Sequence, residues 1–212
     1  MEKQLRQPRS AAVFKVVFAA LAALFVWSAP IVAGAAVSPL SIGIVPPIQF
    51  PPSDYTVTGA RLSLLWGHHR DLYGLDLGVL GNITDQDFHG VALSGVFNLT
   101  RGTTTIVGLQ AAGLVNANIQ KTHVVGLQLA LLANYNEAES MVAGFMVSAA
   151  NIAKFTDVYG AQFGVYNQAK SVYGVQIGLV NVATSLHGIQ IGLMNFNTTG
   201  IFYVAPILNV GF

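Results

Sequence analysis

The sequence predicts an all-β protein, and we expect an antiparallel up-and-down β-barrel of about ten strands. Three observations support this prediction: a glycine-headed phrase recurs nine times between residues 59 and 188, residue character alternates within it, and only 9% of residues are charged. An internal repeat outranks other sequence signals, because overlooking it assigns the wrong fold. The repeat leaves one alternative open, a β-solenoid of 14–18-residue coils.

Residues 1–35 have the form of a secretory signal peptide. Lys3, Arg6, Arg9 and Lys15 precede an uncharged apolar run over 16–32, and the Ala-Gly-Ala at 33–35 resembles a cleavage site. The alternative is an uncleaved membrane anchor, because about 17–20 apolar residues can span a bilayer.

Composition excludes several classes of protein. Hydrophobic residues make up 53% of the chain and there is no cysteine. A disulfide framework and a lipid-bearing cysteine are therefore ruled out. The low charge argues against a disordered chain, and the lack of a basic patch argues against a nucleic-acid partner.

Residues 36–54 form a proline-rich lead-in, with prolines at 46, 47, 51 and 52. Proline is not accommodated in a central strand, so this segment is expected to be extended, at an edge or a linker. The repeat-built domain then covers 55–212.

The repeats are defined by a glycine at the head and an asparagine at the close. The asparagine follows the glycine by eight residues in the earlier full copies and by seven in the later ones. The head glycines are Gly59, Gly74, Gly90, Gly108, Gly126, Gly144, Gly160, Gly174 and Gly188.

The copy at 172–181 shows the alternation most clearly. One predicted face carries Val172, Gly174, Gln176, Gly178 and Val180, and the other carries Tyr173, Val175, Ile177, Leu179 and Asn181. A period of two over ten residues is a strand signal. A ten-residue strand leaves about four residues of a 14-residue period, which suffice for a turn but not for a return path. This reasoning favours antiparallel strands over stacked coils.

Such strands match a transmembrane barrel in the outer membrane, with aliphatic residues toward membrane lipid and a narrow, filled interior. The chain ends on an alternating segment that closes with Phe212. This ending resembles the signal read by the outer-membrane assembly machinery, which we therefore expect as a partner. The oligomeric state is not indicated.

The repeated polar residues are glutamines on the inward face: Gln110, Gln128, Gln162, Gln176 and Gln190. They would line the lumen of a barrel or stack as amide rows in a solenoid. The polar cluster around His68, His69 and Asp71 and the acidic residues at 85, 87, 137 and 139 are expected in solvated turns. We expect no catalytic residue, no cofactor and no metal site, because the phrase carries no nucleophile, acid–base pair or metal ligands.

Three copies of the phrase, at 160–167, 174–181 and 188–195, resemble a bacterial surface-repeat family known from spirochaetes and other diderm bacteria. Its members carry tandem Gly-x-Gln-x-Gly-Leu-x-Asn phrases, and the resemblance covers about residues 55–197. It implies an exported, envelope-associated protein without an assigned enzymatic activity. Many similar proteins look like lipoproteins, and this chain departs from them because it lacks the lipid-bearing cysteine.

The sequence therefore predicts an exported outer-membrane β-barrel protein with a structural or narrow-pore role and no catalysis. The alternative is a surface or periplasmic β-solenoid used for adhesion or protein interaction. Strand direction discriminates between them, since stacked coils require parallel strands.

Overall fold

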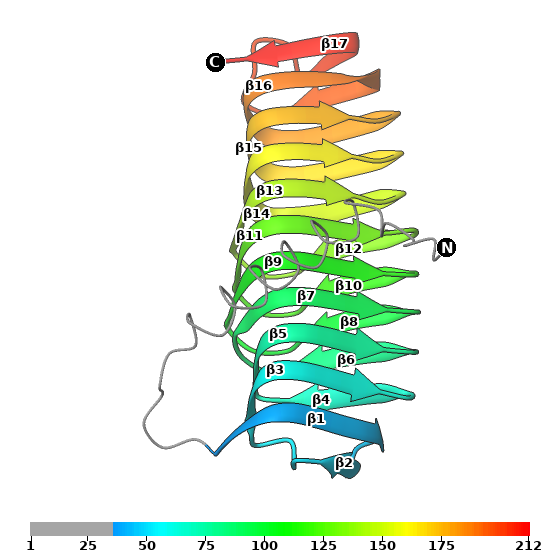
Figure 1. Ribbon diagram of the computed structural model, residues 1–212. Helices are drawn as coiled ribbons and strands as arrows, with labels where there is room; N and C mark the ends of the chain where they lie inside the picture. The colour runs from blue at the N-terminus through cyan, green and yellow to red at the C-terminus, as the bar shows by residue number, and fades with distance from the viewer. Residues whose placement is uncertain (1–35) are drawn as a thin grey trace, which may run out of the picture. The chain divides into compact units, whose positions relative to one another are not determined.

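A computed structural model describes residues 36–212, within a compact unit that spans Ala35–Phe212. The predicted signal peptide lies outside these described residues. The described part is a β-solenoid, in which each repeat makes one coil and the coils pile along a single axis (Figure 1). No helix among residues 36–212 is long and apolar enough to cross a membrane.

Each coil contains a long strand that carries the head glycine and a short strand that carries the asparagine, except that Gly67 replaces the asparagine in the first short strand. The long strands are β3 (Thr56–Ser63), β5 (Asp71–Gly78), β7 (Phe88–Ser94), β9 (Thr104–Ala112), β11 (Thr122–Ala130) and β13 (Ser140–Val147). The short strands are β4 (Trp66–His69), β6 (Gly81–Thr84), β8 (Phe97–Thr100), β10 (Val115–Asn118) and β12 (Ala133–Asn136).

In the last coils the short strand runs directly into the next long one. The merged strands are β14 (Ala150–Phe163), β15 (Tyr166–Ile177) and β16 (Val180–Asn197). The solenoid begins with β1 (Val37–Val45) and β2 (Ile48–Phe50) and ends with β17 (Val204–Gly211). β1 pairs antiparallel with β2, and β16 pairs antiparallel with β17, so a short antiparallel pair closes each end.

Between the ends, every coil pairs in parallel with the next, and equivalent residues lie opposite one another. Gly126 faces Gly108, and Gln128 faces Gln110, for example. The short strands keep the same register, with Asn116 opposite Asn98 and Asn134. Identical positions of successive repeats therefore form columns along the axis.

The expectation of an antiparallel barrel is wrong, and the solenoid alternative describes the chain. The all-β class is confirmed. The error came from the assumed strand length: the phrase at 172–181 is interrupted by a two-residue turn, Gly178 and Leu179, between β15 and β16. A seven-residue segment from Ser171 to Ile177 and a four-residue return then fit within 14 residues.

The turn also changes the side on which the closing asparagine lies. Val172 and Gln176 point inward, and Tyr173 and Leu179 are exposed, as the alternation predicts. The same alternation predicts Asn181 on the outer face, but Asn181 is fully buried. The two turn residues break the period of two, so the parity of the first strand does not carry into the second.

Two long edges run along the solenoid. The turn edge, on the right in Figure 1, consists of eight two-residue turns: 64–65, 79–80, 95–96, 113–114, 131–132, 148–149, 164–165 and 178–179. The charged edge lies opposite, where each short strand leads into the next long strand. There the loops at 85–87, 101–103, 119–121 and 137–139 have three residues, and β14, β15 and β16 have none.

The main apolar column of the core lies two residues before the head glycine. Its members are buried in every coil: Val57, Leu72, Phe88, Ile106, Val124, Val142, Val158, Val172 and Leu186. A single column per coil is a thin core. The remaining interior positions hold polar residues or small ones, such as the buried Ala153, Ala169 and Ala183.

The head glycines mark a point where the backbone of one coil closely approaches the next. Gly126 has φ +143° and Gly188 has φ +149°, a region that L-residues avoid. A Cβ on Gly126 would overlap the carbonyl oxygen of Gly108 in the preceding coil. Glycine is required here by both conformation and space.

Replacing Gly126 with alanine should therefore destabilise the solenoid by more than about 2 kcal/mol, since both the backbone angle and the coil spacing would have to change. Val125→Ala is the matched control, because Val125 is exposed on the outer side of the same strand and should cost under about 1 kcal/mol. Urea unfolding followed by circular dichroism measures both. Equal losses for the two variants would contradict the close-approach explanation.

Candidate functional site

The asparagines that close the repeats form a continuous amide ladder inside the turn edge. Each side-chain Nδ2 donates to the Oδ1 of the asparagine in the next coil, at 2.8–3.0 Å. The ladder members are Asn82, Asn98, Asn116, Asn134, Asn151, Asn167, Asn181 and Asn195.

Each asparagine also donates a hydrogen bond to a backbone carbonyl beside the following turn. Asn167 Nδ2 donates to the carbonyl of Ile177 at 2.9 Å, and Asn181 Nδ2 donates to that of Ile191 at 2.9 Å. These carbonyls lie where the long strand ends. The ladder therefore satisfies backbone acceptors at the turn edge from within.

The glutamines singled out from the sequence are all buried in a second column, two residues after the head glycine. Gln128 Nε2 donates to Gln110 Oε1 at 2.9 Å. In the later coils, Gln176 donates to Gln162 at 2.6 Å and Gln190 donates to Gln176 at 2.7 Å. The structure thus brings them together as two ladders, with packed protein around them rather than a lumen.

Met146 separates the two glutamine ladders, because it occupies the same column between Gln128 and Gln162. Gln162 Nε2 lies 3.4 Å from the Met146 sulfur, a weak acceptor. At the far end of the column, Asn209 from β17 donates to Gln190 Oε1 at 3.1 Å. The final strand therefore closes the ladder with a matching amide.

The first two coils place an ion pair in the glutamine column. Arg61 and Asp76 are fully buried, and the Arg61 guanidinium binds both carboxylate oxygens of Asp76. Burial raises the pKa of the Asp76 carboxyl above its ordinary value, and Arg61 opposes this rise. Sequence reasoning missed this pair, although opposite charges at the glutamine position of consecutive repeats were a usable signal.

His69 joins the pair to the first strand. Its Nδ1 lies 3.3 Å from Arg61 Nη1, and its Nε2 lies 3.3 Å from both Ser41 Oγ and the Pro51 carbonyl. A guanidinium only donates, so Nδ1 accepts and Nε2 carries the proton. Nε2 therefore cannot act as a base toward Ser41, which is itself 1% exposed. The cluster of Arg61, Asp76 and His69 therefore terminates the glutamine column, and its hydrogen bonds do not activate Ser41 as a nucleophile.

The expectation of solvated turns is wrong for His69 and Asp71, which are buried and lie in β4 and β5. The other polar residues noted in the sequence lie at the charged edge. His68 Nε2 pairs with Asp85 at 2.7 Å, and both side chains are partly exposed. Asp71 and Asp87 accept hydrogen bonds from the backbone amides of the next coils, at 3.2 and 2.9 Å. Within residues 36–212, no three His, Cys, Asp or Glu side chains converge as a metal site.

The outer surface is where the aliphatic residues lie. The side chains next to the turn edge are exposed and apolar, among them Leu131, Val165, Leu179 and Leu193. An open apolar groove of about 1290 Å³ crosses the first coils, between β1–β2 and the ends of β3, β5, β7 and β9. Parallel sheets usually have both faces covered, so an uncovered apolar face marks a contact surface.

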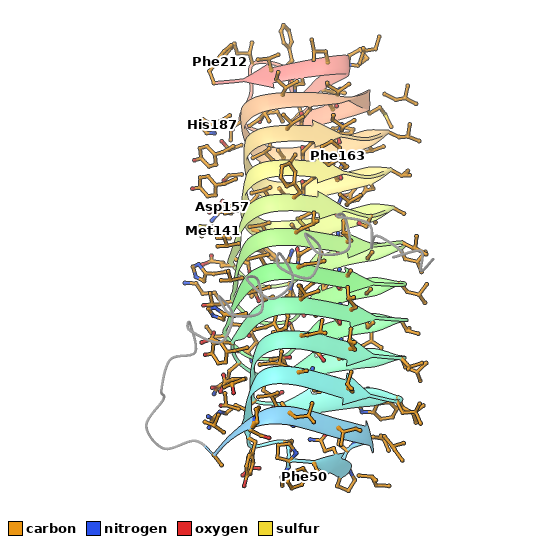
Figure 2. All side chains as sticks on the ribbon, viewed as in Figure 1. Phe50, Met141, Asp157, Phe163, His187 and Phe212 are labelled. Carbon is orange, nitrogen blue, oxygen red and sulfur yellow. The ribbon has the colours of Figure 1, made fainter. Side chains whose placement is uncertain are left out.

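Two stacks of aromatic rings lie between the two edges, one in the early coils and one in the late coils. The rings of Tyr159, Tyr173 and His187 stack with centroids 4.7 and 4.6 Å apart, and Tyr73 meets His89 at 5.0 Å. Figure 2 shows His187 and Asp157 projecting outward on the same side of the ribbon. These residues directly precede, or lie close before, the head glycines.

No protein-family model matches the chain, and neither a curated protein nor a solved structure is significantly similar to it. Function must therefore be argued from the solenoid itself.

Met146→Gln should stabilise the protein, although it places a polar group in a fully buried position. The new amide would connect the two glutamine ladders and add hydrogen bonds, which should contribute about 0.5–1.5 kcal/mol. Met141→Gln on the outer side of the same strand is the control and should change stability by less than about 0.5 kcal/mol. A clear loss of stability on Met146→Gln in thermal unfolding would contradict the ladder interpretation.

Acidification should destabilise the fold through His69. Burial, reinforced by the nearby Arg61 charge, lowers the pKa of His69 from 6.5 to about 4. Between these values the unfolded chain binds the proton and the folded chain does not, so stability falls as the pH drops through this window.

The test is urea unfolding at neutral pH and near the lower pKa for the natural chain and for His69→Asn, whose oxygen can still accept from Arg61. The variant should lose part of the pH dependence. An unchanged pH dependence would contradict a neutral, buried His69.

Proposed function

We propose that this chain is an exported cell-envelope β-solenoid that acts without catalysis, as a scaffold for adhesion or protein interaction. Its setting would be the cell surface or the periplasm. The signal-peptide form of residues 1–35 and the likeness to surface-repeat proteins support export. An outer-membrane pore is not proposed, because the interior is packed by side chains and the strands run parallel.

One observation carries the proposal: the connections between strands vary in length at the charged edge and have a constant length at the turn edge. All eight turns of the turn edge have two residues. The spacing of head glycines rises to 18 residues in the middle coils, where three-residue loops stand at the charged edge. In repeat proteins, insertions gather on one face, which is often the binding face.

The charges at this edge have mixed sign. The middle loops contain Asp85 and Asp87, then Arg101, then Lys121, then Glu137 and Glu139. Such a pattern suits a polar protein contact whose register is set by complementary charges. It does not suit a nucleic acid, which requires a predominantly basic surface.

The experiment is labelling of intact diderm cells that produce the chain, with an amine reagent that does not cross membranes. Within residues 36–212 the lysines are Lys121, Lys154 and Lys170, all exposed and all at the charged edge. A surface protein should be labelled at these lysines in intact cells, and a periplasmic one only after the outer membrane is opened. A chain that is labelled only after full lysis would contradict export.

The interaction is then tested with a photo-crosslinking residue at Arg101 or at Lys121, in the same cells. Discrete adducts with an envelope protein are expected from both sites. The matched control places the residue at Leu179 on the turn edge, where the same protein adduct should not form. Adducts that form equally at both edges would contradict a binding role for the charged edge.

A further inference from the structure

We propose that the turn edge of the solenoid inserts into one leaflet of a lipid membrane, with the solenoid axis in the plane of the membrane and the charged edge in water. This inference goes beyond the interaction role proposed above, because it assigns a partner to the opposite edge. Three observations carry it: the distribution of charge, the layering of side chains and the state of the backbone at the turns.

Charge is completely segregated on the outer surface of residues 36–212. Apart from the buried Arg61–Asp76 pair, every charged residue lies at or beside the charged edge. These twelve residues are Asp54, Arg70, Asp71, Asp85, Asp87, Arg101, Lys121, Glu137, Glu139, Lys154, Asp157 and Lys170. The turn edge and the flanking ends of the strands carry none, so one side of the solenoid suits water and the other an apolar phase.

Between these edges the side chains follow the order found across a membrane interface. Aliphatic residues crowd the turn edge, where Leu131 is 71% exposed, Leu193 66% and Val165 55%. Next comes the position before the head glycine, which holds Tyr or His in the early and late coils and small or aliphatic residues in the middle ones, and the charges follow it. Tyrosine is enriched at the level of the lipid headgroups, where an apolar ring and a polar group are both accommodated.

At the turn edge, backbone N–H and C=O groups are paired within the protein, which suits contact with lipid. Lipid cannot satisfy free N–H and C=O groups, so protein in contact with it must pair them internally. The turn amides donate to the preceding coil, as Leu114 does to Val96 at 2.9 Å, Leu132 to Leu114 at 3.0 Å and Leu179 to Val165 at 3.0 Å. The asparagine ladder pairs strand-end carbonyls from inside.

The dimensions indicate one leaflet. From the head glycine to the turn, each long strand has about four or five residues, or roughly 13–17 Å at ~3.3 Å per residue. Half of the hydrocarbon core of a bilayer is about 15 Å. Since the inserted part carries no charge, binding should occur on neutral phosphatidylcholine and should depend little on salt.

The experiment uses the full chain, which has no cysteine, with single cysteines introduced for a fluorescent bimane label. Leu131→Cys and Leu179→Cys report on the turn edge. Lys121→Cys and Lys170→Cys are the matched controls at the charged edge, and all four positions are exposed. Each labelled protein is mixed with phosphatidylcholine vesicles, with or without bromine on the acyl chains, and is also titrated with aqueous iodide.

We expect brominated lipid to lower the turn-edge fluorescence about twofold or more and to leave the charged-edge fluorescence nearly unchanged, with the reverse order for iodide. Because the readout is local, an apolar segment at 16–32 that holds the chain to the vesicle would not produce this contrast. Unchanged circular dichroism shows that the variants are folded.

Three results would overturn the proposal. Iodide access at both edges would mean that the solenoid stays in water, and lipid quenching at both edges would mean that it is fully immersed. Turn-edge labels shielded from both quenchers would mean that a second copy covers this edge. None of these results bears on the labelling of lysines in intact cells, so the two proposals fail separately.

Discussion

The structure depends on one constraint: each coil must offer its neighbour the same hydrogen-bonding side chain at the same place. The asparagine ladder shows this most directly, because eight buried amides bond from coil to coil and also bind backbone carbonyls at the turns. A buried polar group without a partner costs about 1–3 kcal/mol, so a shifted register would be penalised in every coil at once. The glutamine ladders donate in the opposite direction along the axis, so the amide dipoles of the two columns oppose each other.

The largely polar interior determines which residues lie on the outer surface. Amide columns and small residues occupy most of the inward positions, and only one column is apolar in every coil and consists of larger side chains. The aliphatic residues of an unusually hydrophobic sequence therefore face outward, beside the turns. Since the charges are confined to the opposite edge, the solenoid is amphipathic along its whole length. Both functional proposals follow from this division, one for each edge.

Much of the local structure could be predicted from the sequence, and the architecture could not. The period of two correctly separated inward Gln176 from outward Tyr173, because it reports side-chain direction within a strand. It does not report where a strand turns back, so it predicts strand at Gly178 and Leu179 and the wrong face for Asn181. Arg61 and Asp76 share the glutamine position of consecutive repeats, a signal in the sequence that indicates an ion pair only when equivalent positions lie opposite one another, as they do in a solenoid and not in an antiparallel barrel.

The central claim is that successive repeats stack in parallel and in register. Spin labels at Tyr159 and Tyr173, introduced as cysteines into the cysteine-free chain, test it most directly, because the two rings lie 4.7 Å apart on the outer side. Strong dipolar broadening is predicted, since the labelled strands are neighbours at about 4.8 Å. Absence of broadening would place these residues at opposite ends of antiparallel strands and would contradict the stacked solenoid.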